Sequence, residues 1–272
     1  QSNEDTIRWS ALETAILDRD AQALIDRGRL IGLAIAPAPA APSSAHTSIL
    51  KTPFFHLTQG SECEQRNHHS GSSKRPLRLL DLSTLWAGPL ATSLLAGAGL
   101  DVLKVESPNR PDGAREGPKS FFDLMNEAKR GCALDLRDAA DRAIFERLLD
   151  AADIVVESAR PRALARLGYD AESWGTERAG RLWTAITGYG RTHEWIAFGD
   201  DAATAAGLAF SPDPSELDPC FCADAIADPL TGLHAAALVL AQLRLGRGGV
   251  LDISLRDVAC KAALAKNDGL TL

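Results

Sequence analysis

Beyond residue 76 the chain alternates short apolar runs with segments of helical periodicity, and this alternation constrains the fold more than any other feature. Uninterrupted apolar runs of about four to eight residues are typical of parallel strands buried on both faces. We therefore expect the α/β class, with a doubly wound, mostly parallel sheet and helices on both faces. The expected strands are 77–83, 101–107, 131–136, 153–158, 181–190 and 250–257, and the expected helices are 90–99, 139–152 and 229–245.

The first 76 residues have a different pattern of apolar and polar side chains. Residues 7–30 place apolar side chains at helical spacing and contain no proline, which predicts one or two helices. Residues 58–76 are polar and rich in Ser and Gly, a composition typical of a linker. The predicted division of the chain is a small N-terminal helical satellite at 1–50, a linker at 51–76 and the main domain at 77–272.

The net charge and the apolar runs of the chain argue against nucleic acid and membranes as partners, and its cysteines bear on the compartment. The net charge is −7 and no basic tract compensates it, which argues against nucleic acid. No stretch approaches the roughly 18 unbroken apolar residues of a membrane span, so no membrane partner is expected. The five cysteines are odd in number and show no disulfide framework, which favours the reducing cytoplasm.

Gly97 and Gly99, followed by Glu106, imitate a dinucleotide-binding fingerprint. The phosphate-binding glycines of that motif stand between the first strand and its helix. Here the two glycines follow the helix, where glycine commonly caps the C-terminus, so an NAD-dependent oxidoreductase is disfavoured.

Cys220 and Cys222, with His234 nearby in sequence, are the candidates for metal ligands. Their one-residue spacing departs from the usual spacing of zinc ligands, in which two to four residues separate the cysteines. We therefore expect no metal site.

Asp228 stands directly before Pro229 at the start of the helix predicted over 229–245. One interpretation is helix capping, since Asp is a favoured N-cap and Pro a favoured first helical residue. The other is chemical: a carboxylate at a helix N-terminus is held ionised by the helix dipole and by free N–H groups, which also suit a developing oxyanion. From the local sequence alone, capping is favoured.

Over residues 77–259, in unbroken order, the chain resembles the class III CoA-transferases. This CaiB/BaiF-like family includes formyl-CoA and carnitine CoA-transferases and α-methylacyl-CoA racemases. The phrases that carry the resemblance are the AGP loop, DVLKVES, ALDLRD, ITGYGR and ADPLTGLHAAALVLAQL. It implies a Rossmann-like large domain and an interlocked homodimer with the active site between protomers. Residues 7–40 resemble part of the family's small domain, so residues 1–50 are expected to reach across to the partner.

The resemblance implies that Asp228 is an acyl-carrying nucleophile. A CoA-transferase of this kind moves CoA between an acyl-CoA thioester and a carboxylic acid through a covalent aspartyl intermediate. Acyl-CoA and an acceptor acid are then the partners, CoA is a substrate and no cofactor is permanently bound. The residues that the resemblance places along CoA are Thr84, Leu85, Trp86, Ala87, Leu134, Arg137 and Arg166. For the two arginines, a solvated surface charge remains an open alternative.

Three departures from the family pattern bear on the activity. Ser107, Ser158 and Ala159 replace the usual Arg and Asn-containing CoA contacts. The sequence ends soon after the last expected strand, before the family's second half. The glycine-rich flap of some transferases is not recognisable, since residues 245–249 read as a helix C-cap and turn.

The racemase branch pairs its aspartate with a histidine, which is missing from residues 198–201 here. Only Asp200 and His193 are nearby replacements, and Asp200 with Asp201 reads more simply as a helix cap. An α-methylacyl-CoA racemase-like enzyme and a catalytically incomplete acyl-CoA-binding pseudoenzyme are therefore the alternatives to the transferase.

Overall fold

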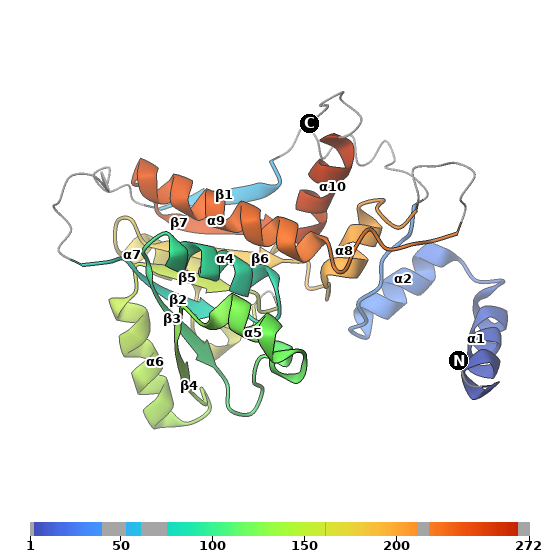
Figure 1. The fold of residues 1–272 in the computed structure, drawn as a ribbon, viewed down its shortest axis with the longest axis horizontal. Coiled ribbons are helices and arrows are strands. Elements are labelled where there is room, and N and C mark those ends of the chain that lie inside the picture. Colours follow the sequence, from blue (N-terminus) through green and yellow to red (C-terminus); the bar gives the residue numbers. More distant parts are fainter. Residues whose placement is uncertain (1–2, 40–52, 61–74, 161, 211–217, 266–272) are drawn as a thin grey trace.

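The computed structural model describes residues 3–39, 53–60, 75–160, 162–210 and 218–265, and a seven-stranded sheet runs through its main body (Figure 1). The strand order is β1-β7-β6-β5-β2-β3-β4. Every neighbouring pair is parallel except β1 with β7. The expected α/β class and mostly parallel sheet are confirmed. The strands are β1 (Phe55–Gln59), β2 (Arg78–Leu82), β3 (Asp101–Glu106), β4 (Arg130–Ala133), β5 (Ile154–Glu157), β6 (Leu182–Thr187) and β7 (Gly249–Ser254).

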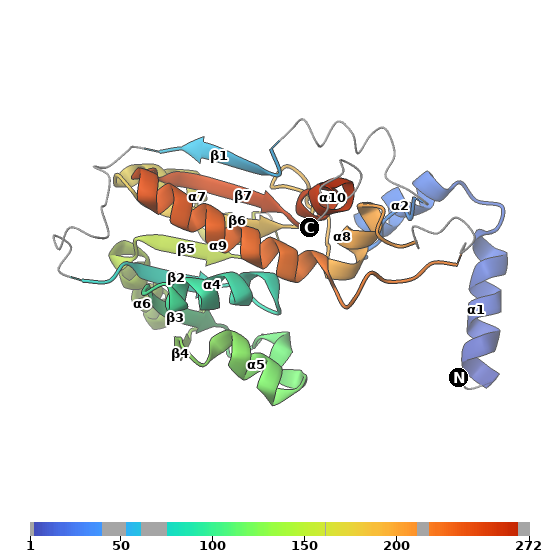
Figure 2. The same ribbon diagram turned by 45° about the horizontal axis from the view of Figure 1, so that its top comes forward.

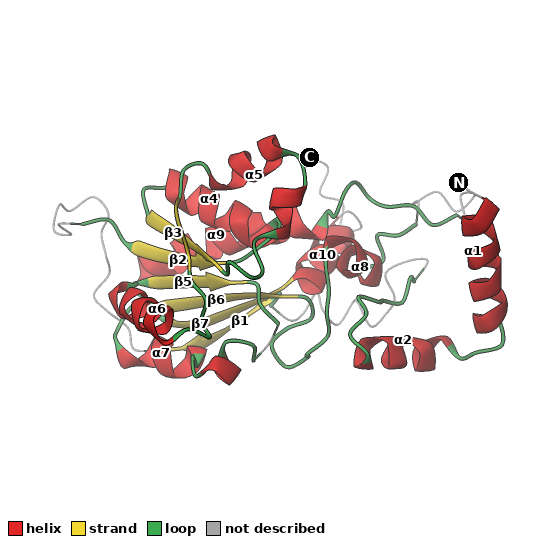
Figure 3. Cartoon of the chain, turned by 90° about the horizontal axis from the view of Figure 1, so that it is seen from below, coloured by secondary structure: helices red, strands yellow, loops and turns green. Residues whose placement is uncertain are grey.

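Helices cover both faces of the sheet (Figure 3). The helices α4, α9 and α10 pack on one face, and α6 and α7 pack on the other. No helix in the described part of the chain has the length and apolar character needed to cross a membrane. The helices are α1 (Asn3–Ile16), α2 (Ala21–Leu30), α4 (Ala87–Gly97), α5 (Lys119–Asn126), α6 (Ala139–Ala151), α7 (Ala171–Glu177), α8 (Gly199–Ala205), α9 (Ala227–Leu245) and α10 (Leu255–Ala265).

The predicted end of the last strand is wrong. The strand expected over 250–257 ends at Ser254, and residues 255–257 begin α10 instead. The hydroxyl of Ser254 accepts a hydrogen bond from the N–H of Asp257 at 3.3 Å, as a helix-capping side chain does. The chain therefore turns from strand to helix without an intervening loop.

The segment predicted as a linker also needs correction over residues 55–59. These residues form β1, which pairs antiparallel with β7 at the edge of the sheet. Phe54, Phe55 and Leu57 pack against the core on the α9 face, so the aromatic and apolar side chains at this point have a buried partner. Most of the remaining predicted linker, 61–74, lies outside the described residues.

Small side chains bring α4 and α9 close together. These helices make the most extensive helix–helix contact of the described fold, and Ala91, Ala235 and Ala236 are buried on that face. A Cβ at Gly232 of α9 would lie 2.7 Å from the carbonyl oxygen of Ala87, so only glycine permits this approach. The packing sets the start of α4 directly beside the first turns of α9.

The order of the strands reverses between β2 and β5, which are neighbours although β3 and β4 lie between them in sequence. In open α/β sheets, ligands bind outside the carboxyl ends of the strands at such a reversal. The loop that leaves β2 for α4 is therefore where a ligand is expected.

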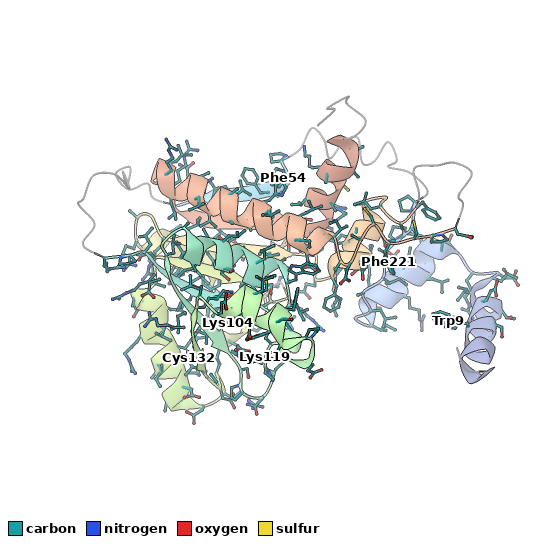
Figure 4. All side chains as sticks on the ribbon, viewed as in Figure 1. Trp9, Phe54, Lys104, Lys119, Cys132 and Phe221 are labelled. Carbon is teal, nitrogen blue, oxygen red and sulfur yellow. The ribbon has the colours of Figure 1, made fainter. Side chains whose placement is uncertain are left out.

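The N-terminal helices α1 and α2 lie at one end of the molecule, beyond α8 (Figures 1 and 2). One or two helices were predicted in this region, and two are present. Trp9, Leu12 and Ile16 of α1 are exposed, and Trp9 stands well away from the sheet (Figure 4).

Candidate active site

Asp228 lies in the first turn of α9, but it does not cap the helix. The N-cap position belongs to Ile226, so the capping interpretation of Asp228 and Pro229 is wrong. The loop before the helix explains the difference. Ala223 and Ala225 adopt left-handed φ angles of 63° and 43°, and the N–H of Asp228 donates to the carbonyl of Ala225 at 2.8 Å. The helix therefore starts earlier than predicted, and the Asp228 carboxylate finds its partners elsewhere.

The backbone N–H groups of Ala87 and Gly199 act on the carboxylate of Asp228 and lower its pKa. Ala87 is the first residue of α4, and Gly199 is the first residue of α8. The first-turn N–H groups of a helix lack partners within their own helix, so they are available to an anion. The starts of three helices thus meet at one carboxylate, which holds it in a defined orientation.

Glycine is required at position 199 for this contact. A Cβ there would lie 2.4 Å from Oδ2 of Asp228 and 2.5 Å from the carbonyl oxygen of Ala225. Any larger residue would displace the carboxylate or the loop that carries it. Where the racemase branch was expected to have a histidine, this chain therefore needs the smallest residue for a backbone contact with Asp228.

Burial raises the pKa of Asp228 to about 6, although the N–H of Gly199 opposes the shift. The negative charges of Asp200 and Asp201 raise the pKa further, and the N–H of Ala87 lowers it. At pH 7 about nine-tenths of the molecules still carry the ionised form, since the pH lies one unit above the pKa. Asp228 is therefore mostly ionised and poorly solvated near neutral pH.

Asp200 and Asp201 occupy the first turn of α8 and have structural partners. Asp201 accepts a hydrogen bond from the N–H of Phe198 at 2.5 Å, which confirms the expected helix-capping role for this residue. Asp200 instead accepts from the N–H of Ala225 at 3.0 Å and holds the loop before Asp228. The two carboxylates thus fix both segments that meet at Asp228.

The predicted CoA loop follows β2 at the reversal of strand order. The N–H of Thr84 donates to Oγ of Ser158 at 3.1 Å, so the serine that replaces the family's asparagine anchors this loop. The N–H of Leu85 donates to Oδ1 of Asp112 at 2.9 Å. Leu85 has a φ of 69°, a left-handed conformation that a non-glycine residue keeps only where its surroundings hold it.

Trp86 and Ala87 complete this loop. The ring of Trp86 packs edge-on against Phe121 of α5, with 5.2 Å between ring centroids. Ala87 is buried and is the residue whose N–H contacts Asp228. The structure thus brings together two groups of residues that the sequence predicted separately, the CoA loop and the nucleophile.

A buried ion pair lies under the loop and was missed in the sequence. Nζ of Lys129 lies 2.9 Å from Oδ2 of Asp81, and both side chains are almost completely buried. Thr92 donates to the same oxygen at 2.6 Å, and Ser83 donates to the other. Burial by itself would raise the pKa of Asp81, but the charges of Lys104 and Lys129 outweigh it and lower that pKa. Asp81 is therefore a buried, fully partnered carboxylate.

A second ion pair continues the network beneath the same loop. Nζ of Lys104 lies 2.9 Å from Oδ2 of Asp112 and donates to the carbonyl of Ser83 at 2.8 Å. Figure 4 shows Lys104 within the body of the fold and Lys119 at its surface. The sequence did indicate both pairs, since Asp81 and Lys104 stand in apolar runs that were predicted to be buried strands. A charged side chain in a buried strand needs a partner of opposite charge.

The other predicted CoA residues lie apart from Asp228. Leu134 is buried in the core on the α6 face. Arg137 is exposed and forms a two-pronged ion pair with Asp135. Arg166 is exposed, and its guanidinium lies 3.7 Å from the carboxylate of Glu194. Among the described contacts, none of the three touches Asp228, so their part in CoA binding stays a prediction.

A model of CoA-transferase family III matches residues 75–266. The chain belongs to CoA-transferase family III. It is 31% identical over 202 residues to the succinate–glutarate CoA-transferase of Agrobacterium fabrum, covering 67% of this chain and 50% of that protein. It is 33% identical over 214 residues to the succinyl-CoA:glutarate CoA-transferase of Mus musculus, covering 72% and 49%. The chain thus spans about half the length of the curated relatives it matches.

Solved structures of family III are similar to this fold. A CaiB/BaiF family protein from Brucella suis aligns with a TM-score of 0.64 at 27% identity, covering 71% of this chain and 56% of that one. A hypothetical protein from Mycobacterium tuberculosis aligns with a TM-score of 0.63, also at 27% identity and with the same coverage. The predicted resemblance to the family is confirmed.

The residues that resembled a dinucleotide-binding motif or a metal site have structural roles in this family III chain. Gly97 is the last residue of α4, and Gly99 follows with a φ of 96°, so both end the helix as expected. Gly246 likewise caps α9 with a φ of 68°. His234 bonds through Nδ1 to the carbonyl of Leu230 at 2.7 Å. Within the described ranges, no group of three His, Cys, Asp or Glu side chains is placed to hold a metal ion.

His193 is the remaining candidate for a racemase partner. Its Nδ1 lies 3.1 Å from the carbonyl of Tyr189, and its ring packs on Trp195 with 4.4 Å between centroids. The contacts described for His193 are with these neighbours and with Thr192, and not with Asp228. The described contacts of His193 thus give no support to the racemase alternative.

Proposed function

We propose that the protein transfers CoA between an acyl-CoA thioester and a carboxylic acid, with Asp228 as the covalent nucleophile. The observation that carries the proposal is the contact between the start of α4, where the predicted CoA loop ends, and the first turns of α9, which carry Asp228: a Cβ at Gly232 would lie 2.7 Å from the carbonyl oxygen of Ala87. This contact joins the nucleophile to the segment expected to hold the thioester. A poorly solvated carboxylate oriented by two N–H groups is suited to attack a carbonyl carbon.

The reaction proceeds in four displacements at carbonyl carbons. The Asp228 carboxylate attacks the thioester, the C–S bond breaks, and CoA thiolate leaves a mixed anhydride. The thiolate attacks the Asp228 carbonyl carbon, which releases the first acid and leaves an aspartyl-CoA thioester. The acceptor carboxylate attacks that thioester, the C–S bond breaks, and CoA thiolate leaves a second mixed anhydride. The thiolate then attacks the acyl carbon of the acceptor, which leaves as its CoA thioester and restores Asp228.

We infer that CoA lies along Thr84, Leu85, Trp86 and Ala87 and extends to Leu134, Arg137 and Arg166. The loop stands where the strand order reverses between β2 and β5, the order of a Rossmann-like doubly wound sheet. The guanidiniums of Arg137 and Arg166 are exposed and supply the positive charge that phosphates require. CoA acts here as a substrate and not as a resident cofactor.

We infer a homodimer in the cytoplasm. The resemblance to family III implies a homodimer, and the exposed Trp9, Leu12 and Ile16 of α1 offer an apolar surface to a partner copy. Cys132, Cys220, Cys222 and Cys260 are all unpaired, which suits a reducing compartment.

The experiment that tests the proposal is trapping of the aspartyl intermediate. The protein is incubated with a panel of acyl-CoAs and hydroxylamine, and the intact mass and its peptides are then measured. Hydroxylamine converts an activated carboxyl to a hydroxamate, a gain of about 15 Da by the chemistry of acyl-enzyme intermediates. We expect the gain on the peptide that contains Asp228.

Two variants sharpen this experiment. Asp228→Ala removes the carboxylate, and the labelling should disappear. Asp224→Asn changes an exposed carboxylate in the same loop, and the labelling should persist. CoA binding without labelling of the wild type would overturn the proposal in favour of an acyl-CoA-binding protein without transferase activity.

A further inference from the structure

The amino end of the sheet contains a cavity that the proposed reaction does not use. Its volume is about 310 Å³, and it lies between the starts of β2, β3 and β4 and the last turn of α6. These strands are parallel, so their first residues, Arg78, Asp101 and Arg130, share one edge of the sheet. The volume is at the lower end of the range that small-molecule sites occupy.

The cavity is separate from the candidate active site. The CoA loop leaves the other end of β2, a strand of five residues, and a strand of that length spans roughly 16 Å. In Figures 1 to 3, α6 lies toward the end of the molecule away from α8 and the start of α9. The residues predicted to bind CoA do not line the cavity, so a ligand bound there would be distinct from CoA.

The charged rim of the cavity has one positive group in excess, since it consists of Arg78, Arg130 and Asp101. Arg130 pairs with Asp101 through Nη2 alone, at 2.8 Å from both carboxylate oxygens. Within the described ranges, the guanidinium of Arg78 pairs with no carboxylate. Asp153 accepts the backbone N–H of Arg78 at 2.9 Å, but Arg75 neutralises this carboxylate at 2.8 Å. The rim therefore favours an anion.

The floor of the cavity is apolar. Leu103 of β3 and Leu148 and Ala151 of α6 line it, and all three are half-buried. Ala151 carries only a methyl group, and the completely buried Ala152 follows it, so the end of α6 leaves space against the sheet. Apolar surface gains free energy by leaving water, so this floor favours an alkyl chain over a phosphate or a sugar.

We propose that the cavity is a second ligand site, for a monocarboxylic acid with an alkyl chain. The carboxylate lies between Arg78 and Arg130, whose guanidiniums present the paired N–H groups that carboxylates accept. The chain lies on Leu103, Leu148 and Ala151. A dicarboxylic acid would place its second charge on the apolar floor, where the lining residues offer no cation. The site does not depend on the proposed CoA transfer.

The test is calorimetry of the whole chain with octanoate as the probe. Octanol carries the same alkyl chain without the charge, and acetate carries the charge without the chain. We expect octanoate to bind more tightly than either compound. Arg78→Gln should weaken octanoate binding by about tenfold to a hundredfold, the range of a lost charged hydrogen bond, and should leave octanol binding unchanged.

Three further variants locate the binding. Ala151→Phe fills the cavity and should abolish binding of octanoate and octanol, with thermal unfolding as the check that the variant folds. Arg147→Gln is the matched control, since Arg147 is exposed on α6 and does not line the cavity. Asp228→Ala should also bind octanoate as the wild type does, because the two sites are separate. Hydrogen exchange should slow on binding in residues 101–104 and 148–152.

The outcomes that overturn the proposal are distinct. A wild type that does not bind octanoate has no such site. Binding that is lost in Asp228→Ala but intact in Arg78→Gln places the acid at the candidate active site instead. Equal affinities for octanoate and octanol would show that Arg78 and Arg130 do not bind a carboxylate. These results leave the labelling of Asp228 by acyl-CoA as a separate test of the proposed function.

Discussion

Asp228 is distinguished by the groups that contact its carboxylate, not by its place before a proline. The N–H groups of Ala87 and Gly199 come from two other helices, and burial is the largest influence on its ionisation. Its reactivity and its cost to stability therefore have one origin. A carboxylate removed from water is more nucleophilic, and it is also less favourable to ionise.

The pKa of about 6 for Asp228 predicts opposite pH dependences for labelling and for stability. Labelling needs the ionised form, so its rate should rise with pH through about 6 and level off above 7. The folded pKa lies above the ordinary value of 3.8, so the folded state holds more protons than the unfolded state between these values. The free energy of unfolding contributed by this group should therefore fall as the pH rises from 3.8 to about 6.

Urea unfolding across this pH range measures the second effect, with Asp228→Asn as the comparison. The variant carries no titrating group at this position, so the difference in stability between it and the wild type should widen in its favour up to about pH 6 and then stay constant. A difference that does not change with pH would show that burial does not shift the pKa of Asp228.

The Gly199→Ala substitution tests the backbone contact. The new methyl group would lie 2.4 Å from Oδ2 of Asp228, so labelling should fall at least tenfold, and overpacking should cost about 1–3 kcal/mol of stability. Gly97→Ala is the control, since a Cβ there meets nothing within 4 Å. Intact-mass labelling rates and thermal unfolding report the two effects, and full activity of Gly199→Ala would remove the N–H of Gly199 from the proposed mechanism.

At the scale of elements, the loop between β2 and α4 is held by charges buried beneath it. Asp81 and Lys129 bind at the carboxyl end of β2, and Lys104 and Asp112 bind the backbone of the loop itself. Each charge has an opposite partner and hydrogen bonds, as buried charges require. The loop can therefore keep the left-handed Leu85 and present the N–H of Ala87 in one position.

Lys129→Met should destabilise the protein strongly, because it leaves the carboxylate of Asp81 buried without its partner. Losing one member of a buried ion pair costs about 3–5 kcal/mol. Lys119→Met is the matched control, since Lys119 is exposed in its pair with Asp123 and should change stability by no more than about 0.5 kcal/mol. Urea unfolding measures both, and the double variant Lys129→Met with Asp81→Asn should recover part of the loss.

At the scale of the whole molecule, the N-terminal helix α1 (Asn3–Ile16) is the part that the sheet does not organise. Trp9 and Leu17 are 68% and 74% exposed, and Leu12 and Ile16 are exposed beside them. Apolar side chains gathered on an outlying helix mark an interaction surface more often than a solvated one.

We expect light scattering to give about twice the chain mass of 28.9 kDa, as two chains require. Trp9→Glu combined with Leu12→Glu places two charges on the exposed apolar side chains of α1 and should give the monomer mass. Glu13→Lys, an exposed change on the same helix, should leave the mass unchanged. A wild-type protein that is monomeric at all concentrations would contradict the proposed homodimer.

Local patterns in the sequence were enough to predict the class of fold, the family and the candidate nucleophile, Asp228. Apolar runs and helical periodicity are properties of neighbouring residues, so they predicted the strands β2 to β6 and the helices α4, α6 and α9 with small errors at their ends. The phrases that resemble the family from residue 77 onward were equally local, and the match of the family model over residues 75–266 confirms the family.

Only the tertiary structure decided which distant groups meet. β1 pairs with β7 across almost 200 residues of sequence, and its edge position could not be read from a short apolar run. The partners of Asp228, the buried pair of Asp81 and Lys129, and the stacking of Arg29 on Trp195 likewise join elements far apart in the chain. Such contacts depend on how helices and strands pack, because a sequence records neighbours along the chain and not the groups that folding brings within hydrogen-bonding distance.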